Sequence, residues 1–384
     1  MDTIQNQGAT RIHWLNASFL FITPIFALIA VIWHSKNYGV GLSELAIFVF
    51  WYLACGMSIT VGYHRLFTHR SHSAAWPLRL LYAGFGAGAF ENSILEWSSD
   101  HRRHHKYVDE EEDPYSASRG FWWSHILWIF LDTNPNPTDL SNVKDLEKDW
   151  IVRIQHKYIF KIGFLVGAVL PALVGYLLGG IGGAIGGFIY GGLVRTVFVQ
   201  HGTFLINSAA HIWGNQPYSK DNTSKDCFWL AFFTFGEGYH NYHHAFQADY
   251  RNGIRWWQFD PSKWWIRTTA FFGLSSNLKR TPKWKIETTK MDSTFGQAVE
   301  EWEVIRGESG LEMFRERAAA SRVAVVKTFR DLEVKRSERK LARDDGRDEI
   351  ARQMKEMKLR IRDIRLEFGN MITEMMQQVA LHPV

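Results

Sequence analysis

Cysteine is scarce in this chain, which has two cysteines among 384 residues. Cys55 stands in an apolar run and Cys227 near a polar loop, and neither belongs to a Cys-x-x-Cys pair. This scarcity excludes a disulfide framework as the basis of the fold. We therefore expect the part of the chain outside any membrane to face a reducing, cytoplasmic compartment.

A strong charge of one sign is also missing, because the formal net charge is only +5. So small an excess gives no reason to expect nucleic acid as a partner, and a basic face toward anionic lipid fits it better. Residues 1–12 lack a basic stretch followed by a small-residue cleavage site, so we expect no removable signal peptide.

Long apolar runs and seventeen tryptophans indicate a lipid bilayer. Four runs approach the ~20 residues that span a bilayer core. They cover residues 16–33, 45–61, 159–178 and 181–199. A short turn joins the first two runs and Gly179–Gly180 joins the last two, so each pair is predicted to form a hairpin. The predicted fold is an all-α integral membrane protein, in which four transmembrane helices are capped by a cytoplasmic helical domain.

Basic residues flank the apolar runs on the side that carries most of the histidines, whereas the two hairpin turns have few. These residues are Arg65, Arg70, Arg102, Arg103, Lys106, Arg153, Lys157 and Lys161. By the positive-inside rule this side is cytoplasmic, and an even number of spans places both termini there too. Arg195, near the inner end of the fourth run, is expected to extend its guanidinium to the interface.

The composition changes near residue 283, where a highly charged helical segment begins. We therefore divide the chain into a transmembrane domain with its cytosolic cap, residues 1–282, and a helical tail, residues 283–384. Apolar residues of the tail recur in alternating steps of four and three, a seam typical of a coiled coil. They are Ile350, Met354, Met357, Ile361, Ile364, Phe368, Met371 and Met375.

Three arrangements of this seam are open from the sequence. It could join a second subunit as a homo-oligomer, or it could form a single amphipathic helix that rests on the domain or the membrane. It could also fold back on the apolar stripe of the preceding helix, formed by Phe314, Val325, Phe329 and Leu332.

Two His-x-x-His-His boxes, at residues 101–105 and 240–244, are the strongest feature of the sequence. On a helix, positions i, i+3 and i+4 share one face, so three imidazoles converge in each box. His64 and His69 form a related pair upstream, and Asn207 and His211 stand four residues apart between the boxes. These nine histidines exceed the roughly four to six ligands of one ion, so two metal ions are expected. The other seven of the sixteen histidines lack this spacing.

Imidazole ligands suit iron, zinc and copper. Nine nitrogen ligands divided over two ions favour redox-active iron over zinc, which usually takes four ligands. Soluble ferritin-like di-iron enzymes repeat a Glu-x-x-His motif, and here only Glu237 with His240 has that spacing. Because the boxes follow membrane helices, we expect the metal pair at the cytoplasmic mouth of the bundle, within reach of a lipid chain.

Four motifs together resemble the membrane fatty acyl desaturases of the acyl-CoA, stearoyl delta-9 type. They are HRLFTH at 64–69, EWSSDHRRHH at 96–105, NSAAH at 207–211 and GEGYHNYHH at 236–244. The likeness extends over residues 16–265 and includes the order and spacing of the motifs. It implies an oxygen-dependent enzyme that removes two hydrogens from a saturated acyl chain and leaves a cis double bond, at the delta-9 position in that family.

The resemblance also implies a site. Its two iron ions would be ligated by His64, His69, His101, His104, His105, His211, His240, His243 and His244, with Asn207 bound through water. Dioxygen would be the co-substrate. Asn16, Asn92 and Trp97 resemble family positions near the acyl head group.

Two departures from the family pattern leave the acyl carrier open. Ser99 stands where acyl-CoA desaturases tend to have an arginine, and Asp132–Thr133 stands where they tend to have a basic pair. Those groups would meet the phosphates of coenzyme A, so the carrier could be coenzyme A, acyl carrier protein or an intact phospholipid.

The electron donor is expected to be a separate protein. The chain has no His-Pro-Gly-Gly core, which would mark a fused haem-binding cytochrome. A ferredoxin, a rubredoxin or a small cytochrome, with its reductase, would serve instead. The resemblance is to bacterial-like members of the family, which implies a bacterial inner membrane.

Two other functions share some of these features. A membrane di-iron hydroxylase of fatty acids or alkanes would have similar histidine boxes but would produce an alcohol rather than an alkene. A non-enzymatic membrane scaffold with a coiled-coil tail would bind metal without consuming oxygen.

Overall fold

The computed structural model describes residues 11–132 and 139–381, which form two compact units. The first unit contains the described residues up to Gln216 together with Asp221–Arg280, and the second contains Pro217–Lys220 and the described residues from Thr281 onward. Each unit has its own buried apolar cluster.

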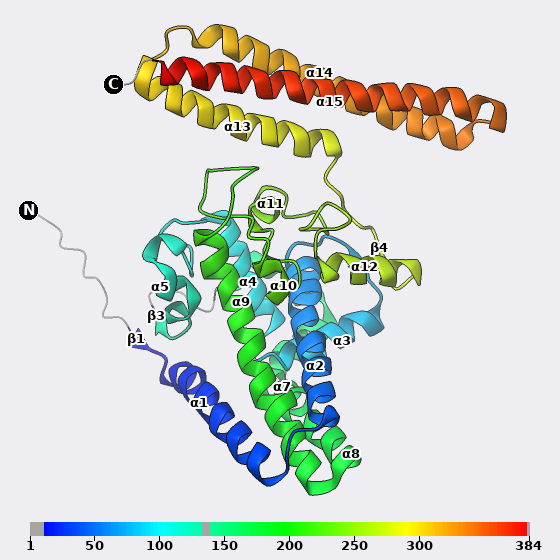
Figure 1. Ribbon diagram of the computed structural model, residues 1–384. Coiled ribbons are helices and arrows are strands. Elements are labelled where there is room, and N and C mark those ends of the chain that lie inside the picture. Colours follow the sequence, from blue (N-terminus) through cyan, green and yellow to red (C-terminus); the bar gives the residue numbers. More distant parts are fainter. Residues whose placement is uncertain (1–10, 133–138, 382–384) are drawn as a thin grey trace, which may run out of the picture. The chain divides into compact units, whose positions relative to one another are not determined.

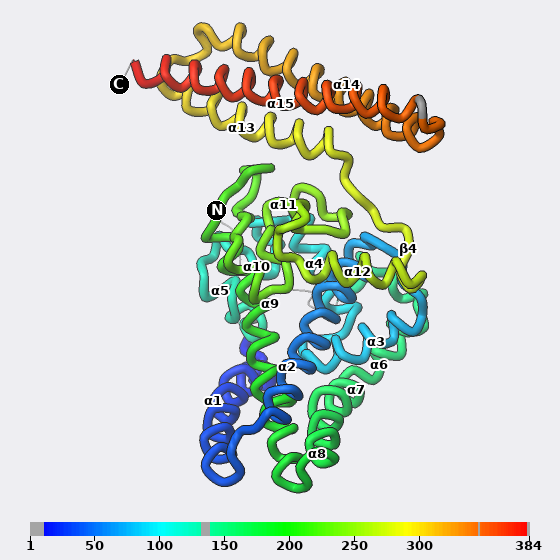
Figure 2. Tube along the Cα trace, turned by 45° about the vertical axis from the view of Figure 1, so that its right-hand side comes forward, coloured from blue at the N-terminus to red at the C-terminus, as the bar shows by residue number. Residues whose placement is uncertain are grey.

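Helices dominate both units (Figures 1 and 2). In the first unit they are α1 (Trp14–Asn37), α2 (Leu42–Met57), α3 (Trp76–Ala87), α4 (Ile94–Lys106), α5 (Phe121–His125), α6 (Trp150–Lys157), α7 (Ile159–Phe164), α8 (Leu170–Gly186), α9 (Arg195–Ile212), α10 (Leu230–Phe233), α11 (His240–Ala245) and α12 (Pro261–Phe271). The π-helical segments η1 (Ser58–Thr68), η6 (Leu165–Val169) and η7 (Gly187–Val194) extend or join some of these.

Short elements complete the first unit. The 3₁₀ turns are η2 (Ala117–Arg119), η3 (Leu127–Ile129), η4 (Ser141–Val143) and η5 (Leu146–Lys148). Strand β1 (Arg11–Ile12) pairs antiparallel with β3 (Leu131–Asp132), and β2 (Ser73–Ala74) pairs antiparallel with β4 (Ser275–Ser276). These two-residue strands tie distant loops to each other.

Three helices of the described chain are long and apolar enough to cross a membrane, at Trp14–Asn37, Leu42–Thr68 and Ile159–Ile212. The third has 54 residues and contains the third and fourth predicted runs. Its helical geometry breaks at Gly179 and Gly180, where Gly180 has φ +61°. The break lies within α8, after which the chain turns back through η7, which packs against α8, and continues into α9 (Figure 1). The turn between α1 and α2 lies close to this break. Nε2 of His34, near the end of α1, is 3.2 Å from the carbonyl oxygen of Gly182.

The two halves of the third helix pack through glycines, whose lack of a side chain lets the backbones approach closely. A Cβ atom added to Gly183 would collide with the carbonyl oxygen of Gly175, and one added to Gly187 would collide with that of Pro171. This close approach fixes the direction of α9, whose last turns carry Asn207 and His211.

Arg195 does not reach the interface, so that prediction is wrong. Its side chain is buried, and its guanidinium donates to the carbonyl oxygens of Gly88, Gly167 and Gly191. The Gly167 and Gly191 carbonyls lie in η6 and η7, where the wide π turns change the usual backbone pairing. The five donors of arginine satisfy such carbonyls inside the bundle and hold the turn after α3 against it.

The second unit consists of α13 (Lys283–Arg306), α14 (Leu311–Leu341) and α15 (Asp344–Ala380). All eight residues of the predicted seam lie on α15, and they pack against apolar residues of the other two helices, including Trp302, Phe314, Val325 and Leu332. Of the three arrangements that the sequence left open, the structure has the seam folded back within the chain.

We predict that Gly183→Ala lowers the stability of the first unit by about 1–3 kcal/mol, because the added methyl group meets backbone that cannot move aside. Gly84→Ala is the matched control, since Gly84 is helical and has nothing within 4 Å of an added Cβ. Its expected effect is neutral to stabilising, by about 0.5–1 kcal/mol. The measurement is the thermal unfolding midpoint of the purified protein in detergent. Equal midpoints for the two variants would contradict the close packing.

Candidate metal centre

Four helical segments of the first unit carry the histidines of the predicted site. His64 lies in η1, and His69 follows directly after it. Helix α4 starts with a capping box between Ser93 and Glu96, which fixes the helix that presents His101, His104 and His105. The remaining members stand on α9 and α11; they are His211, His240, His243 and His244.

The structure brings all nine histidines together in two groups, within each of which the nearest ligand atoms lie within 4.8 Å of one another. The five-histidine group consists of His64, His69, His101, His105 and His243. The four-histidine group consists of His104, His211, His240 and His244. Each His-x-x-His-His box therefore contributes to both groups, and the neighbours His104 and His105 belong to different ones.

The Nε2 atoms face inward in both groups. Within the five-histidine group, Nε2 of His243 lies 3.0 Å from that of His64 and 2.9 Å from that of His105. Within the four-histidine group, Nε2 of His240 lies 3.1 Å from that of His211 and 3.0 Å from that of His244. Nitrogen lone pairs this close together repel one another unless a cation lies between them. The residues therefore fit a metal ion in each group.

The Nδ1 atoms of four imidazoles are held by side chains behind them. In the five-histidine group, Nδ1 of His64 lies 3.0 Å from Glu237 and Nδ1 of His101 lies 2.9 Å from the Tyr115 hydroxyl. A hydrogen bond at Nδ1 fixes the tautomer and leaves the lone pair of Nε2 free for a metal ion.

The four-histidine group has the same kind of support. Nδ1 of His104 lies 2.9 Å from both carboxylate oxygens of Asp113. Nδ1 of His211 lies 2.8 Å from Thr223 Oγ1, and this hydroxyl donates to Asp109 at 2.7 Å. The acidic run at 109–113 thus turns its first and last residues toward the site, whereas residues 110–112 are exposed.

Burial lowers the pKa of most of these imidazoles, and the neighbouring imidazoles lower it further. This holds for His69, His101, His105, His240, His243 and His244. The rings are therefore neutral at pH 7, which is the form that binds a metal ion.

From the sequence, Arg65 is one of the basic residues expected to flank the membrane. In the structure it lies in the interior of the first unit instead. Its side chain is buried and forms ion pairs with Glu237 at 2.9 Å and Asp260 at 3.1 Å. Burial alone would raise the pKa of Glu237, but the charge of Arg65 and the contact with His64 lower it, so Glu237 stays ionised behind His64. Sequence spacing gave no signal for this pairing, because its members lie 172 and 195 residues apart.

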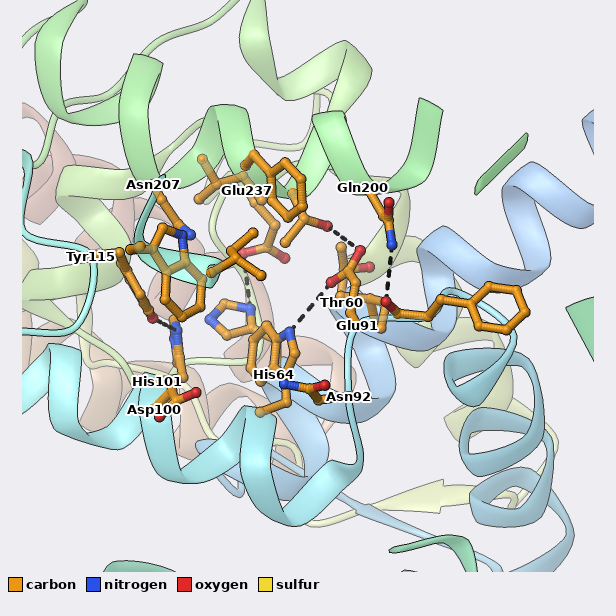
Figure 3. A pocket seen from close by; sticks show the side chains of 18 of the residues that line it. Thr60, His64, Glu91, Asn92, Asp100, His101, Tyr115, Gln200, Asn207 and Glu237 are labelled. Carbon is orange, nitrogen blue, oxygen red and sulfur yellow. Dashed lines mark hydrogen bonds and ion pairs between the residues drawn. The ribbon is translucent and has the colours of Figure 1, made fainter. Parts of the chain in front are cut away.

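A largely apolar cavity reaches the histidines from inside the bundle (Figure 3). Three of the clustered histidines, His64, His101 and His240, line it. Its wall also contains the predicted head-group residues Asn16, Asn92 and Trp97, as well as Asn207. The indole of Trp97 stacks on the ring of His101, with centroids 4.9 Å apart.

Glu91 is a cavity residue that sequence reasoning missed. One carboxylate oxygen lies 2.9 Å from Thr203 Oγ1 and the other 3.4 Å from Trp97 Nε1. Burial raises the pKa of Glu91 to about 8, so this carboxyl is neutral at pH 7. The residues on either side, Phe90 and Asn92, have φ of +58° and +67°, a strained backbone that aims Glu91 into the cavity.

Two positions depart from the family pattern, Ser99 and Asp132–Thr133. Ser99 does not line the cavity. The Ser99 hydroxyl is buried and donates within the α4–η4 region, with Asn142 Oδ1 at 2.8 Å and the Asp139 carbonyl oxygen at 2.9 Å. Thr133 and the side chain of Asp132 lie outside the described part of the structure. These two positions therefore do not distinguish between coenzyme A, acyl carrier protein and phospholipid as the acyl carrier.

We predict that Asp113→Asn weakens metal binding by the four-histidine group about 10- to 100-fold, because His104 loses the carboxylate that orients it. The matched control is Glu111→Gln, which removes the same charge from an exposed position of the same acidic run. Competition with a metal chelator measures the affinities. A similar loss in both variants would indicate a general charge effect instead of a role of Asp113.

Comparisons with known proteins agree with the motifs. The family model for fatty acid desaturases matches residues 43–272. Acyl-CoA desaturase 1 of Saccharomyces cerevisiae is 41% identical over 285 residues, which cover 73% of this chain and 54% of the yeast protein. The sn-1 stearoyl-lipid 9-desaturase of Anabaena variabilis is 34% identical over 282 residues, which cover 73% of this chain and 99% of that protein. Stearoyl-CoA desaturase 5 of Homo sapiens is 38% identical over 244 residues, 63% of this chain and 74% of the human protein.

The match does not cover every part of these proteins. The match covers 54% of the Saccharomyces cerevisiae protein and 58% of the probable acyl-CoA desaturase of Schizosaccharomyces pombe. This chain therefore spans little more than half the length of these two relatives. The region matched by the family model nevertheless contains all nine clustered histidines. This chain belongs to the fatty acid desaturase family.

Proposed function

We propose that this protein is an oxygen-dependent fatty acyl desaturase that introduces a cis double bond at the delta-9 position of a saturated acyl chain. One observation carries the proposal: the largely apolar cavity is lined by His64, His101 and His240, members of the two histidine groups. A long methylene chain in such a cavity would place carbon–hydrogen bonds beside the metal ligands. The names of the relatives, acyl-CoA desaturase and stearoyl-lipid 9-desaturase, support the same reaction.

Two iron ions would occupy the two histidine groups, with Asn207 bound to one of them through water. Bound iron supplies the activation of dioxygen and the oxidation of unactivated carbon–hydrogen bonds, which amino-acid side chains cannot perform. Neutral imidazoles on both ions leave the pair strongly cationic, and the ionised Glu237 behind His64 offsets part of that charge.

The residues of the chain itself would bind and orient the substrate. The apolar wall, which includes Phe19, Leu20 and Phe204, excludes water from the acyl chain. Trp97 covers His101 and closes one side of the cavity. Neutral Glu91 holds Trp97 and Thr203 without placing a charge beside the methylene groups.

The orientation in the membrane belongs to the same proposal. The break at Gly179–Gly180 supports two spans within Ile159–Ile212, which gives four in all. The basic flanks support a cytoplasmic side for the histidines and for both termini. A bacterial inner membrane remains a prediction of the resemblance.

The substrate would be a fatty acyl thioester or an acyl lipid, since the relatives include proteins named for each. Electrons would come from a separate ferredoxin, rubredoxin or small cytochrome with its reductase. A homo-oligomer through the tail would need a surface other than the seam residues of α15, because these pack within the chain.

The test is lipid analysis by gas chromatography with mass spectrometry of a host that expresses the protein. We expect new cis-unsaturated chains from the intact protein and none from a His104→Ala, His243→Ala variant, which loses one ligand from each group. Hydroxylated products would instead indicate a membrane di-iron hydroxylase. Unchanged lipids, despite bound iron and a supplied donor, would refute the desaturase proposal.

A further inference from the structure

A second opening reaches the metal centre from the protein surface. It is a shallow groove lined by Thr68, His69, Arg70, Arg102, His105, Lys106, Gln247 and Ala248. His69 and His105 both belong to the five-histidine group, and both are partly exposed. Two candidate metal ligands therefore line a surface groove that a large molecule can approach.

The groove and the cavity use different ligands. Among the residues that the structure describes, the histidines that line the cavity are His64, His101 and His240, whereas those that line the groove are His69 and His105. An acyl chain in the cavity would thus leave the groove accessible. A partner at the groove could act on the metal centre while the substrate is bound.

The rim of the groove is mostly basic. Arg70, Arg102 and Lys106 line it, and Asp145 pairs with both arginines. The ammonium of Lys106 lies 4.5 Å from the ring centre of Tyr107, and the charge of Glu112 also acts on it. Three cationic side chains against the two carboxylates of Asp145 and Glu112 leave a net positive charge in the groove that exposes the two imidazoles. Such a surface attracts an acidic protein and raises its rate of association.

We propose that this groove is the docking site of the electron donor, a small acidic protein that carries one electron at a time. The inference rests on the proposed function.

In desaturation two C–H bonds break, one C=C bond forms, and O₂ becomes two waters. The acyl chain supplies two electrons and two protons. Two carriers that dock one after the other supply one electron each, and solvent supplies the other two protons. Electron transfer falls steeply with distance, and His69 and His105 are the ligands that the groove exposes.

Two exposed rim residues test the proposal without breaking an ion pair. Lys106→Glu combined with Gln247→Glu makes the rim acidic and leaves Arg70, Arg102 and Asp145 intact. Gln247→Lys makes the rim more basic. Lys157→Glu is the control for Lys106→Glu, because it makes the same charge change at a lysine that is exposed but does not line the groove.

The experiment uses the full-length, iron-loaded protein and two reductants. One is a reduced plant-type ferredoxin, which is small and acidic, and the other is photoreduced deazaflavin, which is small and uncharged. Rapid-freeze Mössbauer spectroscopy measures the rate of iron reduction. With ferredoxin at low ionic strength, we expect the double variant to be at least ~10-fold slower than the natural protein and Gln247→Lys to be faster. These differences should shrink as salt screens the charges.

With deazaflavin, all four proteins should be reduced at the same rate. Equal ferredoxin rates in the natural protein and the double variant, or a similar slowing with both reductants, would overturn the docking proposal. If deazaflavin reduces no iron even in the natural protein, the proposed function fails as well, and the two failures are thereby distinguished.

Discussion

The convergence of nine imidazoles in the interior is the constraint on which the rest of the first unit depends. Nε2 atoms about 3 Å apart present lone pairs to one another, and burial opposes their protonation. A metal ion in each group would resolve this conflict, and the folded geometry of the histidines would then be part of metal binding. The ionised or polar groups behind the rings, Glu237, Tyr115, Asp113 and Thr223, then decide which nitrogen faces inward.

The apolar helices can be understood as the support of this centre. The glycine contacts between α8 and η7 set the path of α9, and buried Arg195 joins that bundle to the turn before α4. Two features of this support are irregular: the π turns of η1, which hold His64 and Arg65, and the strained backbone around Glu91. Both irregular segments border the cavity or the metal centre, as expected where local geometry serves function.

Much of the site could be predicted from the sequence, because helical spacing determines which histidines share a face. The assignment to two groups could not. Consecutive residues on a helix point about 100° apart, so His104 and His105 face different groups, and only the positions of the histidines of the other elements determine which group each one joins. Arg65, Glu91 and Arg195 were misjudged or missed because each is paired with partners far away in sequence. The tail shows the same limit: the heptad pattern predicted the apolar seam, but a partner within the chain and a partner in another chain satisfy it equally well.

The iron content of the full-length protein, purified in detergent from cells grown with ⁵⁷Fe, tests the central claim most directly. Metal analysis together with Mössbauer spectroscopy would count the ions and report on their ligands. We expect two irons per chain, each in a nitrogen-rich environment. A single iron per chain, or zinc in both groups of a protein that is active without iron, would contradict the claim that these histidines form a di-iron centre.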